Sequence, residues 1–256
     1  MPEPKPTQTA FWLQNLATNA DFRSLTSLIV ETLETKLPGK SLEELSDMAE
    51  DQFDAVATSL ELERERQKDD GIEPTFELSY ESGAPYFRKI ASDADKFLQA
   101  LFRISDRDFV DFCVSLLGAL GGDALNIDGP HDGGLDFVAR NLSFSSLNAE
   151  AMRKARVLVV GQAKHYQKEN LVNEPEMRDF VGGGLKRISD HTDRVTHRGP
   201  ALAPVVFAFW TTSDFNSSAK DYAKSVGVWT LNGIALSQLA LKARFGLNDA
   251  GKILSP

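Results

Sequence analysis

The sequence predicts an α/β fold in which helices cover a mixed central sheet. The chain has 256 residues, of which 42% are hydrophobic, enough to bury the core of a full domain. The aliphatic run at 157–160 is rich in valine and typical of a buried strand. From about residue 92 onward, segments with helical periodicity alternate with such runs, which favours helices packed on a sheet.

The first third of the chain is predicted to be helical. Residues 1–7 are rich in proline, and we expect no regular structure there. Ser41 followed by Glu44 is the capping-box pattern, so a helix is expected to begin at this point. Residues 72–90 contain two prolines and alternate in part between apolar and polar positions, which favours a linker or a short hairpin. The expected helices span residues 11–16, 22–37 and 42–68.

After a short helix, the second part is predicted to follow the order α-β-β-β-α-β-α-β-α. Three glycines at 182–184 are expected to interrupt one of its helices. We therefore divide the chain into a helical N-terminal region, residues 1–90, and an α/β domain, residues 91–256. The expected helices are 93–104, 109–120, 174–189, 217–226 and 233–245, and the expected strands are 125–127, 135–139, 157–164, 205–210 and 228–231.

Composition argues against several classes of protein. No run of about 18 apolar residues is present, so we expect no membrane-spanning helix. The N-terminus lacks the basic and apolar regions of a signal peptide. The one cysteine, Cys113, has no partner for an internal disulfide and lies in an apolar helical stretch. We expect it to be a buried core residue of a reduced, cytoplasmic protein.

Charge is distributed unevenly along the chain. The net charge is -9, which does not suggest a nucleic-acid partner. Residues 1–100 hold 10 Lys and Arg against 20 Asp and Glu, whereas residues 151–200 hold 10 against 6. A positive surface beside a metal site would suit a polyanionic substrate, but a chance cluster of solvated lysines explains these counts equally well.

Two short motifs lie at the ends of predicted strands. Residues 131–136, His-Asp-Gly-Gly-Leu-Asp, form a turn that leads into an apolar stretch, and Gly-Gln-Ala-Lys at 161–164 ends the valine-rich strand. Because residues i and i+2 of a strand point to the same face, Gln162 and Lys164 project together. If the two strands pair, the side chain of Asp136 lies beside those of Gln162 and Lys164. An Asp, an amide oxygen and a Lys within a few ångströms form a site for a hard divalent cation and an activated water.

These motifs, in this order, resemble the Mrr-like restriction endonucleases. This family lies in the PD-(D/E)xK nuclease superfamily, in the branch where Gln replaces the acid of the second motif. The resemblance covers about residues 100–245 and none of 1–90. It implies a restriction-endonuclease-like fold and a DNA endonuclease that acts in restriction or anti-phage defence. The segments that carry it are 116–121, 129–136, 161–164, 177–183, 209–212 and the Asn232-Gly233 turn.

The resemblance implies a catalytic set of Asp136, Gln162 and Lys164. Asp136 would supply a carboxylate for Mg²⁺, with Mn²⁺ expected to substitute. Gln162 and the backbone carbonyl of Ala163 would add neutral oxygen ligands. Lys164 would orient the attacking water and stabilise the charged transition state.

The identity of a further metal-binding carboxylate stays open. Many family members carry a Glu in the first helix of the domain, at a position where this chain has Val110. Asp111 is the candidate on that helix, with a solvent-facing acid as its alternative. Asp132 is the candidate in the turn, where it could instead serve only to form the turn. The residues expected to contact substrate are His131, His165 and Lys168.

Other interpretations of the same residues also stay open. Lys164 could form a structural ion pair with Asp136, and the domain would then be a catalytically silent module that binds nucleic acid or a partner protein. A structure-selective resolvase is a third option, because that activity shares the fold. The expected partner is DNA. Residues 1–90 carry too little basic charge to grip DNA, so we expect them to form a homo-oligomer, to dock a partner protein, or only to complete the core.

Overall fold

The chain divides into two compact units, Met1–Asp93 and Ala94–Pro256. The computed structural model describes residues 3–81, 84–127, 134–142, 156–168, 170–190 and 203–256. Each unit buries a hydrophobic core made from its own residues.

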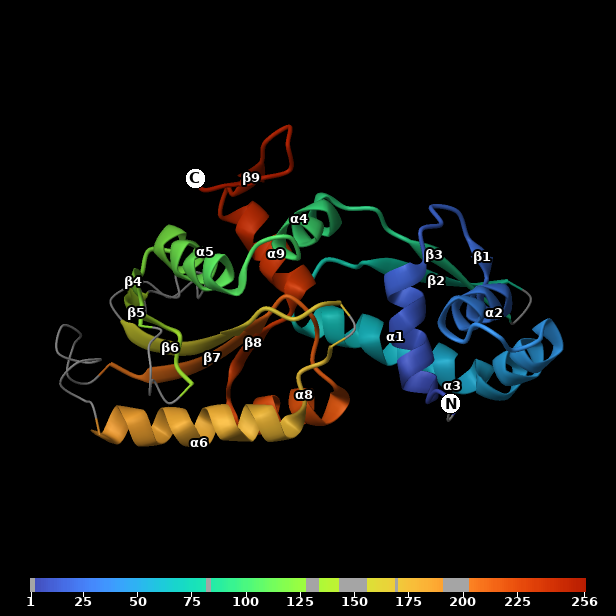
Figure 1. The fold of residues 1–256 in the computed structure, drawn as a ribbon, viewed down its shortest axis with the longest axis horizontal. Coiled ribbons are helices and arrows are strands. Elements are labelled where there is room, and N and C mark those ends of the chain that lie inside the picture. The colour runs from blue at the N-terminus through green and yellow to red at the C-terminus, as the bar shows by residue number, and fades with distance from the viewer. Residues whose placement is uncertain (1–2, 82–83, 128–133, 143–155, 169, 191–202) are drawn as a thin grey trace. The chain divides into compact units, whose positions relative to one another are not determined.

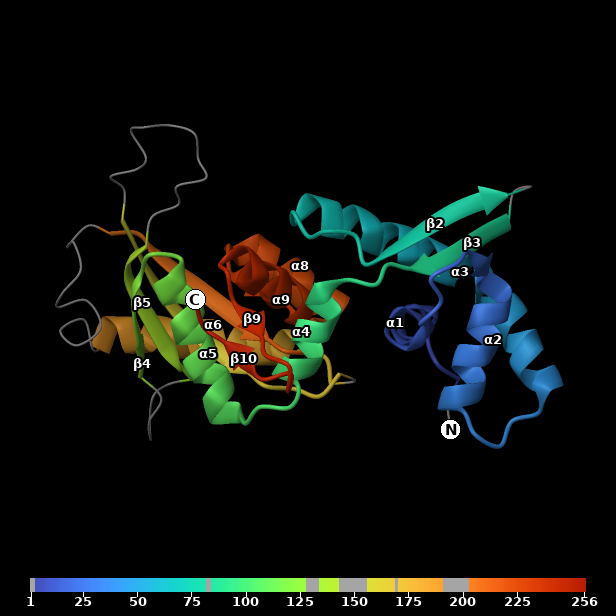
Figure 2. The same ribbon diagram turned by 90° about the horizontal axis from the view of Figure 1, so that it is seen from above.

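The first unit follows the order helix, strand, helix, helix, strand, strand (Figures 1 and 2). Its sheet is antiparallel, and β3 lies between β1 and β2. This order, with this pairing, is the topology of a winged helix. The elements are α1 (Pro6–Leu16), β1 (Arg23–Ser24), α2 (Leu25–Lys36), α3 (Leu42–Asp69), β2 (Phe76–Glu81) and β3 (Ala84–Lys89).

The apolar side chains of the first unit form one buried core of their own. All three helices and both strands of the hairpin contribute to it, and the rings of Phe76 and Phe87 stack at 5.3 Å between centroids. The unit therefore does not need a second surface to cover these side chains. Those that α1 and α2 bury are Leu13, Leu25, Leu28, Ile29 and Leu33.

The N-terminal segment is more ordered than predicted. α1 begins at Pro6, a residue favoured in the first turn of a helix because its missing N–H would have no partner there. The carbonyl of Pro4 accepts a hydrogen bond of 2.9 Å from Gln52 Nε2, and Gln52 Oε1 accepts one of 2.8 Å from the Thr9 hydroxyl. The prediction that residues 1–7 lack regular structure is therefore wrong for Pro6 onward.

The capping box is present at the start of α3, as predicted. Ser41 Oγ accepts a bond of 3.2 Å from the Glu44 amide, and the Glu44 carboxylate accepts one of 2.8 Å from the Ser41 amide. Gly71, with a φ of +68°, follows the end of this helix. The segment 72–90 contains the β2–β3 hairpin, the second of the two predicted alternatives.

A mixed five-stranded sheet forms the centre of the second unit (Figure 1). The strand order is β4-β5-β6-β7-β8, in which β4, β5 and β6 are antiparallel neighbours and β6, β7 and β8 are parallel. This arrangement confirms the predicted α/β class with a mixed sheet. The strands are β4 (Asp123–Asn126), β5 (Phe137–Leu142), β6 (Val157–Lys164), β7 (Val205–Thr211) and β8 (Trp229–Leu231).

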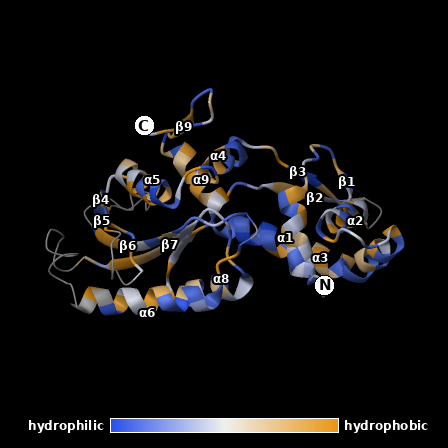
Figure 3. Ribbon diagram, in the orientation of Figure 1, coloured by the Kyte–Doolittle hydropathy of each residue, from blue (hydrophilic) through white to orange (hydrophobic). Residues whose placement is uncertain are grey.

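Helices cover both faces of this sheet (Figure 1). Side chains of α5 and α9 share one core cluster with the sheet, and side chains of α6 and α8 share the other. Hydrophobic and hydrophilic residues alternate along α6, as expected of an amphipathic helix (Figure 3). The remaining elements are α4 (Asp93–Leu101), α5 (Asp106–Ala119), α6 (Glu174–Asp190), α8 (Ser217–Val226), α9 (Gly233–Lys242), β9 (Gly246–Leu247) and β10 (Ile253–Leu254).

The glycines at 182–184 do not interrupt α6, contrary to the prediction. A Cβ added at Gly184 would lie 2.5 Å from the ring of Phe207 on β7. The missing side chain therefore lets the helix approach the sheet closely, and the glycine serves packing instead of breaking the helix. Cys113 is buried in α5, as predicted. Among the described helices, none combines the length and the hydrophobicity that a membrane span requires.

Candidate active site

Strands β5 and β6 stop following the regular ladder where the two motifs meet. Phe137 is paired with Gly161, and the amide of Asp136 donates a bond of 2.8 Å to the Gly161 carbonyl. One step further, Oδ2 of Asp136 accepts a bond of 2.7 Å from the amide of Ala163. A side-chain carboxylate therefore takes the amide that a backbone carbonyl would take in a continued ladder. Asp136 lies just before β5, not within the strand as expected.

Two glycines make room for this arrangement. A Cβ at Gly161 would lie 2.2 Å from ring carbons of Phe137 and 2.9 Å from the carbonyl oxygen of Ala208. Gly134 has a φ of +78°, and a Cβ there would lie 3.2 Å from Nε2 of Gln162. Glycine at these positions allows the strands to pair tightly before the site and the chain to turn beside it.

Gln162 and Lys164 share one side of β6. The intervening Ala163 packs against the core cluster of α5 and α9, so alternation directs Gln162 and Lys164 to the opposite face. The register of β5 with β6 places Asp136 opposite Gln162. Gln162 is 9% exposed and Lys164 is partly buried. The structure thus brings a carboxylate, an amide and an ammonium group to two neighbouring strand ends.

The helix carboxylate Asp111 is exposed and tied to the edge strand. Its Oδ1 accepts a bond of 2.8 Å from Nδ2 of Asn126 on β4. Asn126 is paired with Phe137, the residue that follows Asp136. The charge of Asp136 also reaches Cys113 on α5. Burial raises the pKa of the Cys113 thiol well above its usual value, and the Asp136 carboxylate raises it further.

His165 follows Lys164 but points into the protein. Its side chain is 6% exposed, and its ring lies 5.6 Å from that of Phe109. Nδ1 lies 3.0 Å from a carboxylate oxygen of Asp106, and Nε2 lies 2.9 Å from the Leu101 carbonyl. This geometry connects the end of β6 to α4 and α5, and it does not present the imidazole to a substrate as we expected.

Polar residues that follow β7 were missed by the sequence reasoning. Thr212 is 1% exposed and bonds to the main chain of Tyr166. The Tyr166 hydroxyl donates to Glu176 on α6, and burial followed by this bond raises the pKa of Tyr166 to about 12. A run of hydroxyl and carboxyl residues directly after a buried strand, Thr-Thr-Ser-Asp at 211–214, is the signal that could have found them.

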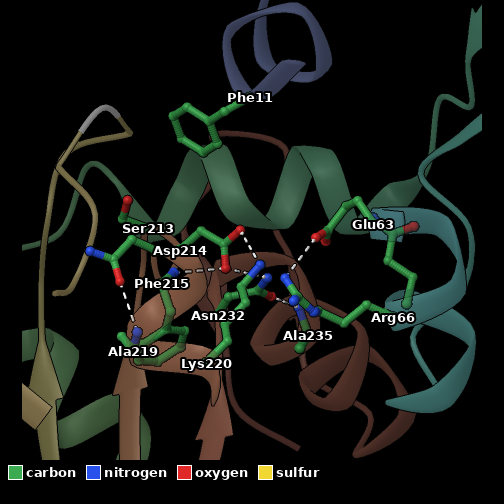
Figure 4. Close-up of polar contacts among 12 residues, drawn as sticks. Phe11, Glu63, Arg66, Ser213, Asp214, Phe215, Ala219, Lys220, Asn232 and Ala235 are labelled. Atoms are coloured by element: carbon green, nitrogen blue, oxygen red, sulfur yellow. Dashed lines mark hydrogen bonds and ion pairs between the residues drawn. The ribbon is translucent and has the colours of Figure 1, made fainter. Parts of the chain in front are cut away.

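Asp214 connects the loop after β7 to the starts of α8 and α9 (Figure 4). Its carboxylate accepts bonds of 3.0 Å from Lys220 Nζ, 3.1 Å from Asn232 Nδ2 and 2.8 Å from the Phe215 amide. Asn232 caps α9 by accepting a bond of 3.0 Å from the Ala235 amide. Lys220 balances the charge of the carboxylate, and the other two donors occupy its oxygens, so this cluster is structural.

The chemistry of the donor set fits a hard cation. Among the residues that the structure describes, no three His, Cys, Asp or Glu side chains gather to hold a metal ion. Mg²⁺ commonly takes one or two protein carboxylates and keeps several waters, so Asp136 with the oxygens of Gln162 and Ala163 is a suitable set. His131 and Asp132 lie outside the described residues. Lys168 is partly buried, in the turn that follows β6.

Comparison with known proteins gives one curated relative. It is the Type IV methyl-directed restriction enzyme EcoKMrr of Escherichia coli strain K12, 30% identical over 164 residues. The match covers 61% of this chain and 44% of the relative, so the chain spans less than half the length of that protein. No protein-family model matches the chain.

Solved structures of restriction endonucleases are also similar. MspJI in complex with a 27-mer oligonucleotide has a TM-score of 0.39 at 19% identity, over 60% of this chain and 35% of that chain. The DNA modification-dependent endonuclease AspBHI has a TM-score of 0.37 at 14% identity, over 66% and 57%. FokI bound to DNA has a TM-score of 0.40 at 10% identity, over 93% and 45%. These scores are too low to establish a common fold. The curated relative confirms that this chain is similar to the Mrr-like restriction endonucleases, as its motifs predicted.

Proposed function

We propose that this chain is a metal-dependent DNA endonuclease that hydrolyses phosphodiester bonds in restriction or anti-phage defence. The observation that carries the proposal is the bond of 2.7 Å from the Ala163 amide to Asp136 Oδ2. Because the donor is a main-chain amide, this bond fixes the carboxylate beside the Gln-x-Lys motif without using the ammonium group of Lys164. The similarity to a methyl-directed restriction enzyme supports the same reaction class.

Each residue of the site has a separate task in this reaction. Asp136, Gln162 and the Ala163 carbonyl would hold Mg²⁺ or Mn²⁺, whereas Asp111 lies on α5, which covers the face of the sheet opposite Gln162. The bound cation would polarise the phosphate and lower the pKa of a water ligand. Lys164 places a compact positive charge where the attacking water and the developing negative charge need it. Lys168 is assigned to contact with the DNA backbone.

The test is cleavage of methylated and unmethylated plasmid with Mg²⁺ or Mn²⁺. Asp136→Ala and Lys164→Ala should each abolish cleavage, EDTA should stop the wild type, and Ca²⁺ should allow binding without turnover. Asp123→Ala is the matched control, because this exposed carboxylate lies on edge strand β4 and bonds to Asn141. Normal cleavage by either site variant would remove the assignment, and DNA binding without cleavage by the wild type would leave the silent module.

Gln162→Glu should keep part of the activity. A carboxylate oxygen can replace the amide oxygen as a metal ligand, and the side chain is nearly the same size. The added negative charge should raise the affinity for the cation. Titration of the cleavage rate with Mg²⁺ measures this. A Gln162→Glu variant that is as inactive as Lys164→Ala would argue that the amide N–H₂ group is required.

We further propose that the first unit assembles two copies of the chain. A double-strand break needs two active sites, and one chain supplies one Asp136/Gln162/Lys164 set. Because the apolar residues of this unit are mostly buried in its own core, the support is this stoichiometry and not an uncovered surface. Sedimentation across a concentration series should show a monomer–dimer equilibrium. Linear plasmid, as opposed to nicked plasmid, should form with a rate that follows the dimer fraction.

A further inference from the structure

The end of β6 is joined to the end of β7 by a side chain after the backbone ladder stops. Lys164 is paired with Thr211, and its carbonyl accepts a bond of 3.2 Å from the Thr212 amide. The Thr212 hydroxyl then accepts a bond of 2.9 Å from the Tyr166 amide and donates one of 2.7 Å to the Tyr166 carbonyl. Thr212 therefore bonds the main chain on both sides of His165.

The Thr212 hydroxyl is suited to this contact because it uses both of its functions on one residue. A hydroxyl can accept and donate at the same time, whereas a methyl group of similar size can do neither. Thr212 is 1% exposed and Tyr166 is partly buried, so water replaces these bonds poorly. Without the hydroxyl, the main chain of Tyr166 would lose both of its bonds to Thr212, the residue that follows β7.

We propose that Thr212 is a positioning residue that holds the backbone of Lys164 so that its ammonium group meets the reacting phosphate. This inference rests on the proposed endonuclease function. Thr212 is not a catalytic residue, because it contacts the chain beside Lys164 and no substrate. Displacement of a reacting group by about 1 Å can cost on the order of 100-fold in rate.

Two other contacts hold neighbouring atoms but cannot replace Thr212. His165 joins its ring to α4 and α5, and the Tyr166 hydroxyl joins α6 through Glu176. Both reach the segment after β6 through its own side chains, at His165 and Tyr166, which can rotate while the backbone moves. Of these three side chains in the described part of the chain, the Thr212 hydroxyl is the one that bonds the Tyr166 main chain itself. A backbone shift at this point would therefore pass directly to Lys164, two residues earlier.

The experiment compares Thr212→Val with Thr212→Ser in single-turnover plasmid cleavage, with DNA affinity measured in Ca²⁺. The valine variant should lose about 100-fold in the cleavage rate constant, and serine, which keeps the hydroxyl, should restore most of it. DNA affinity should stay within about twofold, because Lys164 is held for the reaction and not for binding. The Tyr166 amide should also exchange faster with solvent in the valine variant. Ser237→Ala is the control, since it removes another buried hydroxyl of this unit, bonded to the Gly233 carbonyl.

The outcomes separate this inference from the function on which it rests. A valine variant that cleaves at the wild-type rate overturns the positioning role. So does a valine variant in which fewer molecules are active but the cleavage rate constant of those molecules is unchanged. So does a serine variant as slow as valine. If valine prevents folding, Thr212→Ala with the same measurements decides. A wild type that does not cleave, or a Lys164→Ala variant that does, overturns the proposed function itself.

Discussion

Replacing Gly161 by alanine should destabilise the second unit strongly, although the change adds only one methyl group. The added Cβ would lie 2.2 Å from ring carbons of Phe137 and 2.9 Å from the Ala208 carbonyl oxygen. Carbon atoms pack best at about 3.5–4.0 Å, so the ring would have to move by more than about 1 Å. Phe137 is fully buried, and its ring lies 5.1 Å from that of Trp210, so that side offers little space.

The expected cost is at the upper end of the range for an overpacked core, about 3 kcal/mol. For a unit of this size, such a loss should lower Tm by roughly 6–12 °C. Denaturant unfolding followed by tryptophan fluorescence in a Trp12→Phe background reports on the second unit, which contains the other two tryptophans, Trp210 and Trp229. Gly182→Ala is the matched control, because no atom lies within 4 Å of its added Cβ. It should stabilise α6 by about 0.5–1 kcal/mol through helix propensity.

A double-mutant cycle with Phe137→Leu tests the cause. Removing the ring should make the alanine at Gly161 less costly, so the two changes should couple by about 1 kcal/mol or more. If Gly161→Ala changes the free energy of unfolding by less than about 0.5 kcal/mol, or if the two changes are additive, the packing argument for this glycine is refuted.

Three further predictions concern titration, capping and DNA binding. Tyr166 should titrate near pH 12, above the unfolded value of 10. Its contribution to stability should therefore be complete below pH 10 and lost as the pH rises toward 12. Absorbance titration of the Glu176→Gln variant should find a lower pKa for Tyr166. Ser105→Ala should cost about 1 kcal/mol at the start of α5. Since Ser105 lowers the pKa of Asp108, that pKa should rise toward its usual value in an NMR titration of this variant. DNA affinity should fall with salt at a log–log slope of about -0.9 per phosphate contact, and a flat response would favour a protein partner.

The order of elements in the second unit could be predicted because each carries a local signal. The valine-rich run of β6 and the apolar stripe of α5 identify strand and helix without knowledge of the fold. The association of Asp136 with the Gln-x-Lys motif also follows from alternation along a strand, once β5 and β6 are assumed to pair. The bond from the Ala163 amide to Asp136 could not be predicted from alternation, because it forms where the regular pairing of β5 with β6 has ended.

The features that could not be predicted depend on residues distant in sequence. Burial of His165 requires the start of α5, about 60 residues earlier, to pack over the end of β6. The contact between Thr212 and Tyr166 follows from the parallel register of β6 with β7, which no local pattern specifies. Gly184 of α6 is explained by Phe207, on a strand that follows in sequence, because a Cβ at this glycine would meet that ring. Propensity alone predicted a break at 182–184, and packing of the helix on the sheet overrode it.

The first unit has the topology of a DNA-binding module but not the charge of one. In a winged helix, the second helix of the helix-turn-helix is the element that enters the major groove. Here that helix is α3, and residues 42–60 hold six Asp and Glu and no Lys or Arg. Such a surface would repel phosphates, whereas DNA affinity depends on basic residues that neutralise them. DNA contact is therefore expected from the second unit, which holds Lys164 and Lys168. The acidic helix is better suited to contact with a basic protein surface than with DNA.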